Sequence, residues 1–187
     1  YQFLSVVCNG PTMHALGLER LDKASPSSSK CWRKFHTIWQ SWAGYPTVVT
    51  WDRGLHNRGA FSRGLTAAGV FVRNTGVEAP EQLGRGERHG GIFKDNFARV
   101  VKAHKVVGKN DMKLAANVVI IIKNEYVRKG GISPIQWVLG KYPRAVARLM
   151  EEEELGQLGA LEAALDPATE FGRRASYRLT SMMHFVK

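Results

Sequence analysis

The stretch of the chain that decides its fold is Thr47-Val48-Val49-Thr50-Trp51-Asp52-Arg53-Gly54. Its first five residues are all β-branched or aromatic, which predicts a short strand buried in a sheet. An acidic residue and a glycine-containing loop follow directly. In open α/β sheets, the groups that bind ligands lie at the carboxyl ends of the strands. We therefore expect Asp52 to be a site residue, with an Asx turn at the strand end as the structural alternative.

Strand and helix patterns alternate on either side of this stretch. Trp32, Phe35, Trp39 and Trp42 recur at steps of three and four residues, which predicts a helix with one apolar face. Residues 118–122 would suit a strand as well as a helix. Strands are expected at residues 1–8, 12–21, 47–51 and 70–73, and helices between the 25–29 loop and Gly44, at 60–68, at 87–107 and at 112–127. This order predicts one α/β domain with a C-terminal helical extension.

The composition is that of an ordinary globular protein, but the charge is not. Apolar residues make up 44% of the 187 residues, whereas 27 Lys and Arg stand against 16 Asp and Glu, a net charge of +11. A domain this basic is typical of proteins that bind a polyanion, either a nucleic acid or an anionic membrane surface. A basic soluble protein without such a partner is the alternative.

Several classes of protein do not fit the sequence. The apolar run at residues 118–122 is far shorter than the roughly 20 residues that span a bilayer. Cys8 and Cys31 are too few for a disulfide framework or a four-cysteine zinc site, so we expect a reduced, intracellular protein. No P-loop, GxSxG or GxGxxG pattern occurs, and no histidine is spaced to pair with a cysteine. The chain begins at Tyr1, within a strand-like run and without Met or a leader, so we expect a piece of a longer protein.

A second candidate site residue, Glu87, lies in the most basic part of the chain. Residues 85–113 carry eight basic and three acidic side chains, a net charge of +5. On a helical wheel, Glu87, Lys94 and Lys105 fall within about 20° of one another, opposite a row of apolar residues. The basic residues of this face are Arg88, Lys94, Arg99, Lys102 and Lys105.

An acidic residue within a row of cations is typical of a metal site that handles phosphates. The cations follow the phosphate backbone and the carboxylate holds Mg²⁺. The structural alternative is a glutamate at the start of a helix, where it interacts favourably with the helix dipole.

Three blocks of sequence together resemble the catalytic core of a retroviral or retrotransposon integrase. They are Val48–Gly54 with Phe61 further on, Gly86–Lys94, and Arg128–Gly140. The family pairs an aspartate at a strand end with a glutamate on a later helix, and here 34 residues separate Asp52 from Glu87. It favours Arg directly after that glutamate and Lys seven positions after it, as in Arg88 and Lys94. A Ser-Pro pair followed by apolar residues and glycine closes the core, as in Ser133–Gly140.

The resemblance implies a ribonuclease-H-like fold, a mixed sheet flanked by helices, over residues 1–145, with a helical extension over residues 146–187. It implies a polynucleotidyl transferase that cleaves the 3′ ends of its element and joins them to target DNA by two-metal phosphoryl transfer. Asp52 and Glu87 would be catalytic residues and ligands of two Mg²⁺ or Mn²⁺ ions. The DNA-binding residues would be Arg88, His89, Lys94, Arg99, Lys102 and Lys105.

The resemblance also implies the partners and the place of action. We expect the chain to bind the DNA ends of its element and the target DNA, to form homo-oligomers, and to bind no membrane. We expect it to be intracellular, and nuclear when it acts on host DNA.

One feature of the family is missing from residues 1–187. The family carries its first aspartate on the central strand, and that position falls before Tyr1, whereas Asp22 ends a different strand. We therefore expect the chain taken alone to lack the central strand of its sheet and to be catalytically incomplete. Two other functions stay open: a non-catalytic nucleic-acid-binding remnant of a transposable element, and a different ribonuclease-H-like nuclease, against which Ser133–Gly140 argues.

Overall fold

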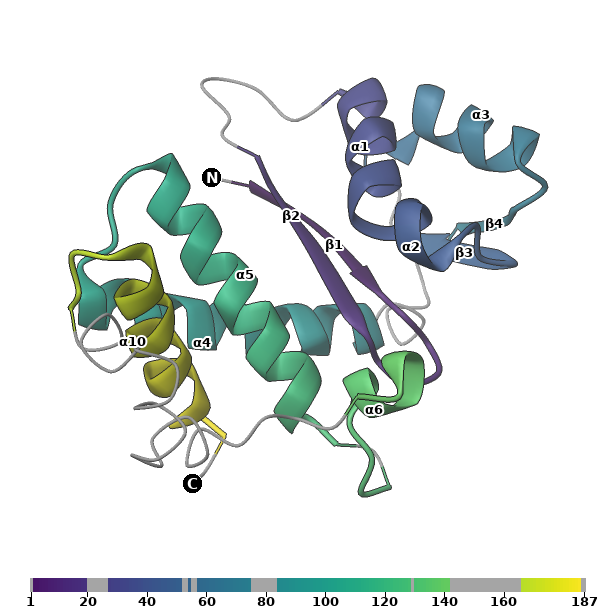
Figure 1. Cartoon of the computed structure of the whole chain (residues 1–187). Coiled ribbons are helices and arrows are strands. Elements are labelled where there is room, and N and C mark those ends of the chain that lie inside the picture. The colour runs from purple at the N-terminus through teal and green to yellow at the C-terminus, as the bar shows by residue number, and fades with distance from the viewer. Residues whose placement is uncertain are drawn as a thin grey trace. The chain divides into compact units, whose positions relative to one another are not determined.

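The computed structural model describes residues 2–19, 27–51, 54, 57–74, 84–128, 130–141 and 166–185 (Figure 1). Asp52 and Asp22 lie outside these ranges. The strands are β1 (Gln2–Val7), β2 (His14–Glu19), β3 (Val48–Trp51) and β4 (Phe71–Asn74). The helices are α1 (Ser28–Phe35), η1 (His36–Gln40), α2 (Ser41–Ala43), α3 (Ala60–Ala67), α4 (Gly84–His104), α5 (Lys109–Tyr126), α6 (Pro134–Leu139) and α10 (Glu170–Met182).

The expected strands and helices are confirmed, as is the mixed α/β class. Residues 118–122 belong to helix α5. Val118, Val119, Ile120 and Ile122 are all buried, so α5 buries more than one of its sides. A helix that is buried on several sides has an apolar run that is nearly continuous, which explains the ambiguity of the sequence at this point.

The chain folds into two compact units. The first consists of residues 1–7 and 15–90, and the second of residues 8–14 and 91–187. Each unit is described separately below.

The strands of the first unit form two separate pairs. β1 pairs with β2, and because only six residues connect them these strands run antiparallel. β3 pairs with β4 in parallel, in a register that places Val48 opposite Phe71 and Trp51 opposite Asn74. Helix α3 connects β3 to β4, so the three elements form a βαβ unit. Among the described residues, no strand joins the two pairs into one sheet.

Helix α1 packs against the hairpin of β1 and β2 at a glycine. The side chain of Ser27 caps the helix and accepts a hydrogen bond from the Lys30 amide at 3.3 Å. A Cβ atom on Gly17 would lie 2.5 Å from the Lys34 side chain, so only glycine allows this approach of helix to strand. Lys34 in turn donates to the Leu18 carbonyl at 3.3 Å.

Aromatic residues fill the space between α1, α3 and β3. Phe35, Trp51 and Phe61 are buried, and the ring centroids of Phe35 and Phe61 lie 5.6 Å apart. Trp32 lies against Gly64 of α3, where a Cβ atom would come within 2.6 Å of the indole. Aromatic side chains, among them the edge-to-face pair of Phe35 and Phe61, therefore make up much of the core of this unit.

The expected single apolar face of the first helix needs a correction at Trp42. The helical stretch from Ser28 to Ala43 contains the π-helical segment η1, whose wider turn rotates the residues that follow it. Trp39 is buried, but Trp42 is 43% exposed and donates from its indole to the Ile38 carbonyl at 2.8 Å. The steps of three and four residues hold only for a regular α-helix, which explains the difference.

The second unit is built from helices. α5 and α10 pack against each other, and Asn96 of α4 donates to the carbonyl and the hydroxyl of Ser181 on α10, at 3.2 and 2.9 Å. Asn124 of α5 holds the backbone of His14 with two hydrogen bonds, one accepted from the His14 amide at 3.0 Å and one donated to its carbonyl at 2.9 Å. These asparagines and Ser181 are buried, so the polar contacts fix how α4 meets α10 and how α5 meets the chain at His14.

Candidate nucleic-acid interface

Helix α4 carries the candidate interface. Glu87 lies in its first turn and is exposed. Phe93 and Val100 are buried at 2% and 0% exposure, which confirms that the apolar side of the helix faces the core. Glu87 makes no ion pair with any described side chain, so its carboxylate is available to a cation or to solvent.

The basic residues around Glu87 face solvent. All eight basic side chains between residues 85 and 113 are exposed. We call the five of them on the expected binding face the basic stripe: Arg88, Lys94, Arg99, Lys102 and Lys105. The charge excess of this segment therefore lies on the surface, where it can act on a polyanion.

Lys105 ends α4 in a conformation that glycine usually adopts. Its φ of 48° is left-handed, and the amide of the next residue, Val106, donates back to the Val101 carbonyl at 3.1 Å. This is the position after a helix C-terminus that favours glycine, because a Cβ atom there is crowded. The residue at this turn is nevertheless Lys105 of the stripe, whose positive charge also interacts favourably with the negative end of the helix dipole.

His89 departs from the expectation. It is only 7% exposed and lies on the core side of α4, away from the basic stripe. It lies about 200° from Glu87 around a regular helix, so the periodicity of α4 accounts for its burial. We leave His89 out of the interface, since a buried imidazole does not reach a phosphate backbone.

The expected metal site falls partly outside the described residues. Trp51, the last residue of β3, is described, but Asp52 directly after it is not. Among the described residues, no three His, Cys, Asp or Glu side chains come together as a possible metal site. Glu87 has the hard oxygen ligands that Mg²⁺ prefers and is solvent-exposed, so its own chemistry fits the role of one ligand.

The third block of the resemblance forms a short, well-capped helix. Ser133 caps α6 and accepts from the Gln136 amide at 3.4 Å, while the Gln136 side chain accepts from the Ser133 amide at 2.8 Å. Pro134 occupies the first turn and Gly140 ends the helix with φ 63°. This is a capping box with a left-handed C-terminal residue, so the local sequence alone accounts for the helix. Trp137 of this helix is 63% exposed.

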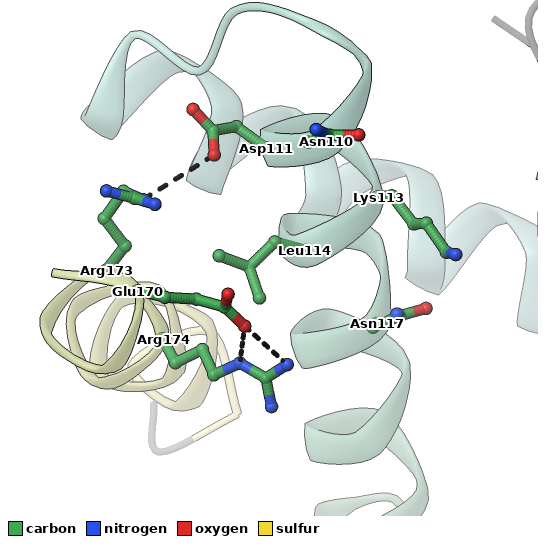
Figure 2. Close-up of a pocket in the computed structure, with 8 residues that line it drawn as sticks. All are labelled: Asn110, Asp111, Lys113, Leu114, Asn117, Glu170, Arg173 and Arg174. Carbon is green, nitrogen blue, oxygen red and sulfur yellow. Dashed lines mark hydrogen bonds and ion pairs between the residues drawn. The ribbon is translucent and has the colours of Figure 1, made fainter.

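A polar hollow of about 380 Å³ lies between α5 and α10 (Figure 2). It is lined mainly by polar side chains: Asn110, Lys113 and Asn117 from α5, and Glu170, Arg173 and Arg174 from α10. The hollow cannot be predicted from the sequence, because its lining residues come from two helices more than 50 positions apart. Only Lys113 gave a signal, as part of the charge excess at residues 85–113.

No family model matches the chain, and no curated protein matches it in a sequence search. In the part of the chain that the structure describes, every helix is too short or too polar to cross a membrane.

Proposed function

We propose that the chain is part of a retrotransposon-type integrase core, a polynucleotidyl transferase in which Asp52 and Glu87 bind divalent metal ions and the basic stripe binds DNA. The strongest support is the surface of α4. An exposed and unpaired carboxylate in the described structure, Glu87, stands among cations that are all exposed. A solvated helix face without a polyanion partner would more often mix charges of both signs.

The order of the elements gives further support. β3 ends directly before Asp52, it pairs in parallel with β4, and Glu87 follows in the first turn of a long helix. The carboxyl end of a parallel strand is where α/β proteins place ligand-binding groups. The block Ser133–Gly140 forms the short helix that would close the core.

The strand pairs fit the proposed ribonuclease-H-like fold. A sheet without its central strand would leave two pairs of strands, and the described strands form two pairs.

The residues of the proposed site would have two roles, which are to hold the metal ions and to position the phosphate backbone. Asp52 and Glu87 would hold Mg²⁺ or Mn²⁺ as oxygen ligands and would not transfer protons. Ions bound there would supply the charge that activates the attacking oxygen and stabilises the leaving oxygen. The stripe would hold the phosphate backbone in register, since Lys and Arg contacts to phosphates position a nucleic acid without reading its sequence.

Strand transfer by the product of the complete reading frame tests the catalytic part. We expect Mg²⁺-dependent joining of a labelled element end to target DNA to fall to background in Asp52→Asn and in Glu87→Gln. The matched control is Asp95→Asn, which removes an exposed acid from the same helix and should keep the activity. Activity that persists in both site variants would refute the site assignment. Binding without any strand transfer in the complete protein would instead favour the non-catalytic remnant.

DNA binding by residues 1–187 tests the stripe. Affinity should fall steeply with salt, and Arg99→Gln combined with Lys102→Gln should reduce the slope of log K against log salt by about 1.8, because each phosphate contact on duplex DNA contributes about 0.9. Fluorescence anisotropy with a labelled duplex at several salt concentrations measures both slopes. An affinity that does not change with salt would contradict a phosphate-binding stripe.

A further inference from the structure

We propose that the hollow between α5 and α10 is a second phosphate-binding site for the same nucleic acid, in which Arg174 of the C-terminal helix acts with Lys113 and Asn117 of α5. The site extends the basic stripe and therefore rests on the proposed function. It gives α10 a part in binding DNA, which neither the sequence nor the resemblance suggests.

The two carboxylates of the hollow are already engaged. Asp111 lies 3.6 Å from Nε of Arg173, and Glu170 accepts from Nη2 and Nε of Arg174 at 2.9 and 3.1 Å (Figure 2). Each negative charge is therefore offset by an arginine of α10. The remaining charged side chain of the lining, Lys113, is positive.

The groups that are not engaged are mostly hydrogen-bond donors. The Lys113 ammonium makes no ion pair with any described side chain, and the side-chain amides of Asn110 and Asn117 make no hydrogen bond within the described residues. Arg174 has five N–H groups and directs only part of them at Glu170. An anion with several acceptor oxygens matches this set, and a phosphate group is such an anion.

The ion pair between Arg174 and Glu170 is weak enough for Arg174 to bind another anion instead. Arg174 and Glu170 are 58% and 66% exposed, and they are neighbours one turn apart on the same helix. Exposed pairs of this kind gain little from each other, because solvent and salt screen the attraction. A phosphate can bind the guanidinium with two parallel hydrogen bonds and can therefore compete with Glu170 for Arg174.

Both helices begin beside the hollow. α5 starts at Lys109 and α10 at Glu170, and the lining residues come from the first three turns of α5 and the first two turns of α10. The amino-terminal ends of helices carry partial positive charge, which favours an anion nearby. Here this effect adds to the side-chain charges of Lys113 and Arg174.

Three lysines follow one another at four-residue intervals along the sequence from the stripe to the hollow, and we call them the lysine row. Lys105 follows α4, Lys109 opens α5, and Lys113 lies one turn further along the same side of α5. All three are exposed. A long polyanion can bind along the whole row, whereas a small phosphorylated molecule would use the hollow alone. The row therefore favours a nucleic-acid backbone as the ligand.

The test compares two charge-matched double variants of the chain for binding to a short labelled DNA duplex. Lys113→Gln with Arg174→Gln removes the proposed contacts. Arg128→Gln with Lys141→Gln removes an exposed Arg and an exposed Lys of the same unit. Arg128 follows the end of α5 at Tyr126, which lies 13 positions and therefore about 20 Å beyond Lys113 along the helix. Equal midpoints of thermal unfolding would show that both variants are folded.

We expect the first variant to lower the slope of log K against log salt by about 1.8 and to weaken binding in 0.1 M salt by about 10- to 60-fold. The control should change neither quantity by a comparable amount. An effect no larger than that of the control overturns the proposal.

A stripe variant, Arg99→Gln with Lys102→Gln, separates this outcome from failure of the proposed function. If it weakens binding while the hollow variant does not, the stripe stands and the hollow is not a contact. If neither weakens binding, both proposals fail. A final arm titrates inorganic phosphate against the chain and follows the Arg174 side chain by NMR. Phosphate binding there without any effect of the hollow variant on DNA affinity would identify a small-anion site and overturn the backbone assignment.

Discussion

Lys123 is buried on α5 with 0% exposure, and its ammonium nitrogen has no hydrogen-bond partner in the described part of the chain. Burial lowers its pKa from 10.5 to about 8, because the charged form loses hydration that the protein does not replace. Below pH 8 both the folded and the unfolded chain carry this proton, and the folded state bears the full cost of the buried charge.

This burial makes stability depend on pH in a defined direction. Between the folded pKa of about 8 and the unfolded value of 10.5, the unfolded chain binds more protons, so stability rises with pH, by up to about 3 kcal/mol. We expect Lys123→Met to raise the free energy of unfolding at pH 7 and to abolish that rise. Urea unfolding at a series of pH values measures both effects.

Lys113→Met is the control for this prediction, since it removes an exposed lysine from the same helix. It should leave the pH profile as it is. A Lys123→Met profile that still rises between pH 8 and 10.5 would contradict the assignment of the effect to Lys123.

At the scale of elements, Gly64 shows how packing overrides helix propensity. It lies in α3, where alanine would ordinarily stabilise the helix by about 1 kcal/mol. A Cβ atom would however lie 2.6, 2.7 and 2.8 Å from three atoms of the Trp32 indole. Such overpacking typically costs about 1–3 kcal/mol.

We expect Gly64→Ala to lower the free energy of unfolding by about 1–2 kcal/mol, because the clash with Trp32 outweighs the gain in propensity. Gly91→Ala in α4 should raise it by about 1 kcal/mol, since no atom lies within 4 Å of the added Cβ. Chemical denaturation of the two variants gives the comparison. Stabilisation by both substitutions would mean that α1 and α3 are not packed this closely.

In the tertiary structure, side chains of α10 form hydrogen bonds and an ion pair with helices that are far from it in sequence. Arg178 donates to Glu125 of α5 at 2.6 Å, and these side chains are only 18% and 10% exposed. His104 of α4 lies 2.8 Å from the Thr180 hydroxyl. Burial and the negative charge of Asp111 raise the pKa of Tyr177 on α10, while the positive charge of Arg173 lowers it.

We expect Arg178→Ala to destabilise the protein by about 3 kcal/mol, because it leaves the Glu125 carboxylate buried without this partner. Arg174→Ala, which breaks the exposed pair with Glu170, should cost less than about 1 kcal/mol. Thermal and urea unfolding of both variants test the difference. Equal small losses would show that α10 does not depend on the Arg178–Glu125 contact.

The local elements follow from local sequence. The strand Val48–Trp51, the caps at Ser27 and Ser133, and the ends at Gly44 and Gly140 all follow from neighbouring residues. The burial of Phe93 and Val100 and the exposure of the basic stripe follow from the period of the helix. The same period accounts for the burial of His89, which the family resemblance had placed on the DNA-facing side.

The succession of strands and helices and the concentration of positive charge around Glu87 can both be predicted from the sequence. Short-range backbone preferences and helical periodicity are enough to set both. The pairing of the described strands into two pairs, the packing of α10 on α5 and the placing of Arg174 and Lys113 around one hollow depend on tertiary structure. These contacts join residues many positions apart, and each depends on side-chain volumes and buried polar partners, as at Gly17, Asn96 and Asn124. Neither helical periodicity nor local backbone preference can predict such contacts between residues that are far apart in sequence.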